Sequence, residues 1–244
     1  MKVFQFILAI FLLSEAMLNP AAAIVKSNDR NQDSYRKQAK EFPEVGIILP
    51  RRGLGTLIAD RWVITSAQVA QSIPEGQGAM DFQGKRYEIE KIVINRDGNE
   101  TEANRIALLK LRKPVKKIDP ISIYSGASEV GLIAVLLGYG SSEPTDISTC
   151  AATNKVEEVS PDWIFFRFDE SPDATDLKGI CAAGDLGGPA IIEIKGKRFL
   201  VGINVANPES GNSTIEKSAY IVYTRLSSCY DWIVDTMRSA ILTE

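Results

Sequence analysis

Three sequence motifs carry the residues on which catalytic chemistry would depend. The motif GDLGGP contains Leu186, the motif NRIALLKL contains Arg105, and the motif GTLIADRWVITSAQ ends at Gln68. Leu186 has no nucleophilic atom, the amide of Gln68 cannot accept a proton near neutral pH, and Arg105 carries a permanent positive charge. The sequence also contains no histidine, so no imidazole can serve as a general base.

The residues around these three positions are similar to the catalytic motifs of the trypsin-like serine proteases. The family patterns are G-[ST]-L-I-x-x-x-W-V-[IL]-T-A-A-H, N-D-I-A-L-L-K-L and G-D-S-G-G-P. Four further segments resemble family motifs: GYG at 138–140, LVGI at 200–203, YTRLS at 223–227 and DWI at 231–233. The matches run in order from about Phe42 to about Ile233. This resemblance implies an all-β fold of two packed antiparallel six-stranded β-barrels with a C-terminal helix.

The resemblance also implies that Gln68, Arg105 and Leu186 stand where the family has its histidine, aspartate and serine. A serine hydroxyl becomes nucleophilic only when an adjacent imidazole, oriented by a carboxylate, takes its proton. Losing one member already costs several orders of magnitude in rate, and losing all three removes the mechanism. We therefore predict a catalytically inactive homologue with no catalytic residues. The alternative is an active hydrolase that uses Ser66, Lys110 or a carboxylate, although no spacing suggests a nucleophile–base pair.

The substrate cleft implied by the resemblance has changed as well. Its residues are Asn204, Val205, Ala206, Asn207 and Ile221. Asn207 stands where the family has a glycine that keeps the pocket open, and Ile221 replaces another pocket glycine. At the base of the pocket, Gly179 and Ile180 replace the aspartate of trypsins, so a preference for lysine or arginine substrates is not expected.

Two features of the family's active site are retained in the sequence around Leu186. The backbone N–H groups of Gly184 and Leu186 could form an oxyanion-hole geometry, which needs backbone atoms only. The alternative, which we favour, is that Gly184, Gly187 and Gly188 simply allow a tight turn.

The second retained feature is Asp185, which in active relatives forms an ion pair with the ammonium group of a new N-terminus beginning Ile-Val. In this sequence Ile24 and Val25 directly follow the expected signal cleavage. We predict an Ile24–Asp185 ion pair, and the alternative is that Asp185 binds amides of its own loop.

The first 23 residues are typical of a secretory signal. Lys2 gives the positive start, residues 3–13 are apolar, and three alanines at 21–23 provide the cleavage pattern. The apolar run is short for a membrane span, although an uncleaved anchor is the alternative. We expect a secreted protein, extracellular or periplasmic, without stable membrane insertion after signal removal.

Residues 24–244 are predicted to form one trypsin-like domain. The expected parts are an N-terminal barrel at about 24–117, a C-terminal barrel at about 118–228 and a helix at about 229–242. The polar segment before Phe42 is expected to be an extended arm. Short apolar runs between turn residues predict the strands, at residues 45–49, 57–58, 62–65, 87–94, 106–111, 133–137, 163–168, 190–194, 199–205 and 220–223.

Three cysteines allow one disulfide in an exported protein. We predict a Cys150–Cys181 disulfide between two loops that border the same pocket, with Cys229 left reduced. The family disulfide beside the catalytic histidine is missing, because Gly53 and Val69 occupy its two positions. Zinc is not expected, since the cysteines are dispersed and there is no imidazole; no cofactor is expected either.

Composition limits the kind of partner. The chain has 28 basic and 31 acidic residues, a net charge of −3, so there is no basic excess to favour nucleic acid. Asn99 and Asn212 lie in glycan-acceptor triplets, which matter only in a eukaryotic host. We expect a protein partner, with the chain acting as a binding or regulatory module. An alternative is a decoy or cofactor for an active protease or its inhibitor.

Overall fold

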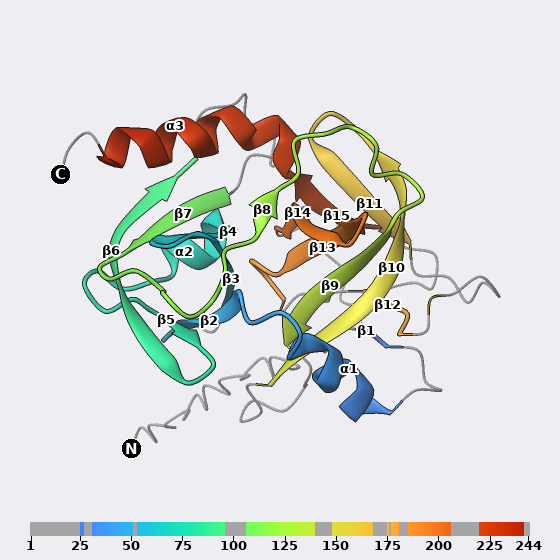
Figure 1. Cartoon of the computed structure of the whole chain (residues 1–244), viewed down its shortest axis with the longest axis horizontal. Coiled ribbons are helices and arrows are strands. Elements are labelled where there is room, and N and C mark those ends of the chain that lie inside the picture. Colours follow the sequence, from blue (N-terminus) through green and yellow to red (C-terminus); the bar gives the residue numbers. More distant parts are fainter. Residues whose placement is uncertain are drawn as a thin grey trace, which may run out of the picture.

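The chain folds into two β-barrels that pack side by side, and the C-terminal helix starts beside the second barrel and runs over the first (Figure 1). The computed structural model describes residues 25–26, 31–50, 53–95, 106–139, 148–167, 175, 177–180, 185–205 and 220–241. Residues 1–24, which include the expected signal peptide, lie outside this description. So do Asn99 and Asn212, the two glycan-acceptor asparagines.

The N-terminal barrel is a closed ring of six antiparallel strands in the order β2-β3-β4-β7-β6-β5. The strands are β2 (Val45–Leu49), β3 (Gly53–Ala59), β4 (Trp62–Ser66), β5 (Ala79–Phe82), β6 (Lys85–Ile94) and β7 (Ile106–Leu111). Every residue of β4 and β7 is buried, because these neighbouring strands face the barrel core on one side and the second barrel on the other. Their β-branched and leucine side chains suit both surfaces.

The C-terminal barrel is closed by six strands in the order β13-β9-β10-β11-β15-β14, with β14 pairing back onto β13. The strands are β9 (Ile133–Tyr139), β10 (Thr149–Val159), β11 (Trp163–Arg167), β13 (Pro189–Ile194), β14 (Lys197–Asn204) and β15 (Tyr220–Arg225). A short strand, β8 (Ser122–Ile123), joins β14 in parallel. The predicted fold class, two six-stranded barrels with a terminal helix, is confirmed.

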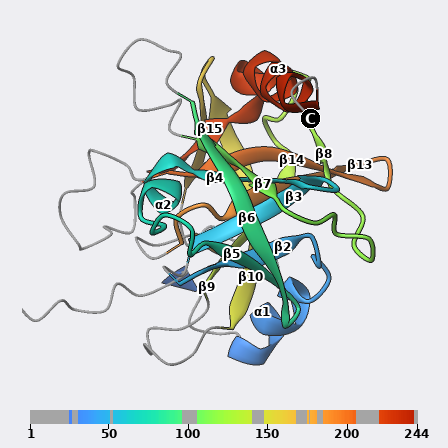
Figure 2. The ribbon, with the colours of Figure 1, turned by 90° about the vertical axis from the view of Figure 1, so that its left-hand side faces the viewer.

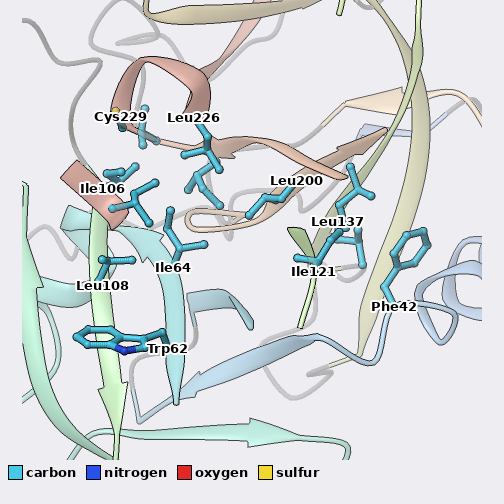
Figure 3. Packing of buried hydrophobic residues seen from close by; sticks show 14 of the residues in the cluster. Phe42, Trp62, Ile64, Ile106, Leu108, Ile121, Leu137, Leu200, Leu226 and Cys229 are labelled. Atoms are coloured by element: carbon cyan, nitrogen blue, oxygen red, sulfur yellow. The ribbon is translucent and has the colours of Figure 1, made fainter. Parts of the chain in front are cut away.

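A hydrophobic cluster fills the space between the barrels (Figure 3). Trp62, Ile64 and Leu108 enter it from the N-terminal barrel, and Leu137 and Leu200 enter it from the C-terminal barrel. Ile121, from the segment that connects the two barrels, and residues of the C-terminal segment add further side chains to the same cluster. One continuous core therefore spans the boundary between the barrels. Removing apolar surface from water stabilises a fold by roughly 25 cal/mol per Å². Burial of this cluster therefore fixes the relative position of the two barrels.

The segment before the first barrel contains a helix, and the prediction of an extended arm is wrong there. Helix α1 (Gln32–Ala39) begins after Asn31, whose side-chain oxygen accepts the N–H of Asp33. Tyr35 and Ala39, four residues apart on one helix face, are its buried residues. Tyr35 enters the core of the C-terminal barrel, and its hydroxyl donates to the carbonyl of Lys178 at 3.1 Å. Two buried residues are too few to give a helical pattern in a polar sequence.

The C-terminal helix is confirmed with slightly different bounds. A 3-10 turn, η2 (Leu226–Cys229), leads into α3 (Tyr230–Ile241), so Cys229 precedes the α-helix. Ile233 and Ala240 of α3 are buried in the cluster between the barrels. No helix in the described ranges has the length and apolar character needed to cross a membrane.

A buried ion pair closes one end of the C-terminal barrel. The guanidinium of Arg225 donates to both carboxylate oxygens of Glu129, each at 2.8 Å, and also to the carbonyl of Ser160 at 3.1 Å. The side chain of Glu129 is 1% exposed and that of Arg225 is 11% exposed. This two-point contact fixes the segment that precedes β9 against the end of β15.

Replacing Glu129 by alanine should lower the free energy of unfolding by about 3–5 kcal/mol, because the buried guanidinium loses its counter-charge. The measurement is denaturant unfolding of the purified variant. The matched control is Glu88→Ala, which breaks the exposed Arg112–Glu88 pair and should cost less than about 1 kcal/mol. Equal losses in the two variants would contradict a special role for the buried pair.

Candidate functional site

Gln68 lies at the start of a short helix that follows β4. Helix α2 (Ala67–Gln71) is capped by Ser66, whose hydroxyl oxygen accepts the N–H of Val69 at 3.2 Å. The side chain of Gln68 is exposed, whereas Ser66 is buried and engaged in the cap. The helix begins at Ala67, one residue before Gln68. The capping role gives Ser66 a structural reason to be present.

Leu186 lies in a turn between the two barrels and is half-buried. Its side chain packs against the hydrophobic core of the N-terminal barrel, the cluster that includes Val69 and Leu109. Its carbonyl accepts the N–H of Leu54, on β3, at 3.2 Å. The leucine therefore contributes to the apolar packing between the barrels.

The turn that carries Leu186 is held by backbone hydrogen bonds to β14. The Gly187 N–H donates to the carbonyl of Asn204 at 2.9 Å, and the Asn204 N–H donates to the carbonyl of Gly188 at 2.8 Å. The Asn204 side chain also donates to the carbonyl of Asp185 at 3.3 Å. Asn204 was predicted as a cleft residue, and its side chain holds this turn.

Glycine is required at position 187 by geometry. Its φ of +80° lies in the left-handed region. A Cβ there would also collide with the Leu54 carbonyl oxygen and the Thr65 hydroxyl. That hydroxyl in turn donates to the Leu54 carbonyl at 2.6 Å. The tight-turn interpretation therefore explains Gly187, while Gly184, the other half of the predicted oxyanion hole, lies outside the described residues. Sequence reasoning missed Thr65, although it stands inside the WVITSAQ motif.

The structure brings the Gln68 and Leu186 segments together. Gly53, the first residue of β3, lies against the side chain of Val69, so that a Cβ on Gly53 would collide with both Val69 methyl groups. Gly53 precedes Leu54, which binds the Leu186 carbonyl, and Val69 follows Gln68. An apolar glycine–valine contact thus occupies the two positions where the family resemblance implies a disulfide. Arg105 lies outside the described residues.

The remaining cleft residues are only partly described. Val205 is buried in the cluster between the barrels. Ile221, on β15, is half-buried and packs against the core of the C-terminal barrel. Gly179 and Ile180, at the expected pocket base, form β12 (Gly179–Ile180). Ala206 and Asn207 lie outside the described residues, so the predicted narrowing by Asn207 stays a prediction.

Asp185 is fully buried at 0% exposure, beside the backbone of β9. A Cβ on Gly138 would lie within 2.7 Å of the carbon and both oxygens of the Asp185 carboxyl group. Strand β1 (Val25–Lys26) pairs with β12, and Val25 is opposite Ile180. This pairing brings the residue after Ile24 to the segment that leads into Asp185. Ile24 itself is outside the described residues, and the Ile24–Asp185 pair stays a prediction.

The two described cysteines lie in different parts of the core. Cys150 is fully buried on β10, opposite Gly138, and not in a loop as expected. Its predicted partner Cys181 is outside the described residues, so the Cys150–Cys181 disulfide stays a prediction. Cys229 is 3% exposed at the end of η2. Burial raises the pKa of its thiol, and the contact with Ser228 lowers it in part, which favours the unreactive protonated form.

A comparison with protein families agrees with this arrangement. The family model described as Trypsin matches residues 34–233, which include both barrels and the first turn of α3. The chain belongs to the trypsin family.

Three relatives illustrate how far the similarity extends. The thrombin-like enzyme elegaxobin-2 of Protobothrops elegans is 29% identical over 73% of this chain and 83% of its own length. The snake venom serine protease BITS01A of Bothrops insularis is 29% identical over 56% of this chain and 61% of its own length. The complement C1s subcomponent of Sus scrofa is 25% identical over 78% of this chain, but only 32% of C1s is covered. The chain therefore corresponds to about a third of C1s.

Gly138→Ala should destabilise the protein by about 1–3 kcal/mol, because the new methyl group overlaps the Asp185 carboxyl group in a packed interior. The measurement is the free energy of unfolding from denaturant titration. Gly138→Ala should cost less in an Asp185→Ala background, where the carboxyl group is gone. The same cost in both backgrounds would show that another neighbour opposes the methyl group.

Proposed function

We propose that this chain is a secreted, non-catalytic member of the trypsin family that acts as a protein-binding or regulatory module. The observation that carries the proposal is the placement of Leu186. A nucleophile must present an oxygen or sulfur atom to the substrate. The residue in the GDLGGP turn instead offers a hydrocarbon side chain, half-buried against the core of the N-terminal barrel.

The other residues that could take part in catalysis support the same conclusion. The sequence has no histidine, and Gln68, which stands at the position of the family histidine, is an exposed amide that cannot act as a base near neutral pH. Ser66 caps α2 through its hydroxyl oxygen. Lys110 is buried on β7, with its ammonium 3.9 Å from a carboxylate oxygen of Glu90. Neither residue is therefore placed as a nucleophile.

The second candidate is an active serine-type endopeptidase with a rearranged site. The names of the relatives favour it, since they include a thrombin-like enzyme and a venom serine protease. The two candidates differ in a directly measurable property, the hydrolysis of peptide bonds. A decoy or cofactor role for an active protease or its inhibitor is a special case of the proposed binding function.

The mature protein should show no peptidase or esterase turnover, because nucleophile, base and orienting carboxylate are all replaced. The measurement is hydrolysis of a broad fluorogenic peptide library, with a fluorophosphonate probe for serine nucleophiles and an active trypsin as positive control. Leu186→Ser alone should not recover activity, since its hydroxyl would lack an imidazole. Combining it with Gln68→His and Arg105→Asp should recover little, because we expect Asn207 and Ile221 to narrow the pocket.

One outcome of these assays would refute the inactive assignment: hydrolysis that copurifies with the protein and is abolished by replacing one of its own side chains. Trypsin-like rates from the triple variant would refute only the argument about the narrowed pocket.

The mature chain should begin at Ile24, with its amino group paired to Asp185. One extra residue before Ile24 should lower the free energy of unfolding by about 3–5 kcal/mol, because the buried carboxylate loses its counter-charge. N-terminal sequencing and denaturant unfolding provide the two measurements. In an Asp185→Asn background the same extension should cost much less. An extension that leaves stability unchanged in the native background would show that Asp185 serves only its own loop.

A further inference from the structure

A groove of about 800 Å³ lies between helix α1 and the outer face of β2. Figure 2 shows the two elements as neighbours at the lower side of the N-terminal barrel. We call it the α1–β2 groove. Its α1 wall contains Arg36 and Lys37 of the helix and the C-cap residue Lys40, and its floor contains Val45, Ile47 and Leu49. The β5–β6 turn and the start of β10 complete the far wall. Neither Gln68 nor Leu186 lines it.

The floor of the groove is an apolar stripe on an outward-facing strand surface. Residues of β2 alternate between buried and half-buried, with Gly46 and Ile48 pointing inward. The outward-facing positions of an antiparallel barrel strand are usually polar, but here they are Val45, Ile47 and Leu49. Successive members of this stripe are separated by about 6.8 Å, twice the rise of an extended residue. An extended peptide has the same spacing between side chains on one of its faces.

The α1 wall carries unbalanced positive charge. Lys37 and Lys40 are exposed, and neither forms an ion pair within the ranges that the structure describes. Arg36 lies 3.9 Å from Asp33. On the opposite wall, a carboxylate oxygen of Asp81 accepts the N–H of Gly84 at 2.7 Å. The lining as a whole has three basic residues and two acidic ones, Asp33 and Asp81. The two exposed lysines lie on the α1 side, where they can meet a ligand that brings carboxylates.

Acidic residues next to β2 do not cancel this charge at the groove. Glu41 lies 3.6 Å from Arg198 of β14. Glu44 is 6% exposed, and burial raises the pKa of its carboxyl group, an effect that its own backbone N–H and Arg198 partly oppose. Neither side chain lines the groove.

The groove is also preformed, because α1 is anchored within the helix by Tyr35 and just after it by Phe42. The Tyr35 hydroxyl binds the Lys178 carbonyl in the C-terminal barrel. After the helix, Phe42 enters the cluster between the barrels, and the Arg198 guanidinium lies 4.3 Å from the centre of its ring. A groove whose walls are already held in place loses less conformational entropy when it binds a ligand.

We propose that the α1–β2 groove binds an extended acidic segment of a partner protein. The segment would place apolar side chains at alternate positions on Val45, Ile47 and Leu49, and carboxylates beside Lys37 and Lys40. Charge complementarity selects this occupant over a basic or uncharged peptide. The proposal rests on the proposed function, since it assigns a surface to a chain that acts by binding proteins.

The test uses a phage-displayed library of random peptides selected on the immobilised mature protein. Enriched peptides should combine alternating apolar residues with glutamate or aspartate. A fluorescent synthetic copy of one enriched peptide then gives the affinity by fluorescence anisotropy. Lys37→Glu together with Lys40→Glu should weaken its binding by at least about tenfold, and added salt should weaken binding to the native protein. The matched control combines Lys116→Glu with Lys117→Glu, two exposed lysines outside the groove, and should bind like the native protein.

The floor is tested by Ile47→Asp, which should abolish binding by placing a carboxylate under the peptide. If that variant does not fold, as judged by circular dichroism, the two exposed lysine substitutions on α1 still decide the question. A library that yields no enriched peptide, or only basic or uncharged ones, would overturn the proposal. Equal weakening by the α1 and control substitutions would do the same. Failure of the proposed function is seen separately, as hydrolysis of the fluorogenic library by the same preparation.

Discussion

The hydrogen bonds around the Asp185–Gly188 turn connect the two barrels, and the geometry of the candidate site depends on them. The Leu186 carbonyl accepts from Leu54 on β3, while Gly187 and Gly188 exchange bonds with Asn204 on β14. These bonds use backbone atoms, so they do not require any particular side chain at position 186. The family frame can therefore persist with a leucine at position 186, provided that glycine remains at position 187, where the Leu54 carbonyl and the Thr65 hydroxyl leave no space for a Cβ.

The strands with continuous apolar runs were predicted best from the sequence. The predicted bounds of β2 and β7 agree with the structure, because apolar runs between turn residues are a strong local signal. β10 was missed although it spans Thr149–Val159. Its sequence TCAATNKVEEV is rich in alanine and polar residues, which have weak strand propensity. Pairing with β9 and β11 on its two sides makes it a strand, and such tertiary pairing leaves no periodic mark in the sequence.

The sequence indicated which segments form the candidate site, but it did not indicate the contacts that their side chains make. Motif matching placed Gln68 and Leu186 in one region, and the Gly53–Val69 and Leu54–Leu186 contacts bring those segments together. The sequence did not indicate that the Leu186 side chain would pack into the N-terminal barrel, or that the Asn204 amide would bind the Asp185 carbonyl. These are contacts between residues far apart in the chain, decided by packing of the whole core. The α1–β2 groove was unpredictable for a related reason, since one of its walls is a helix expected to be an extended arm.

Helix α1 links the α1–β2 groove to the segment 177–180. The helix that carries Lys37 and is followed by Lys40 is also the helix whose Tyr35 donates to the Lys178 carbonyl. The segment 177–180 is bound on its other side by β10, through the Thr153 N–H to the Leu177 carbonyl at 2.8 Å and the Asn154 amide to the Gly179 carbonyl at 3.3 Å. Because Tyr35 is fully buried, α1 cannot shift without breaking its hydrogen bond or moving this segment. The contacts that hold α1 therefore also hold one wall of the α1–β2 groove in place before any ligand binds.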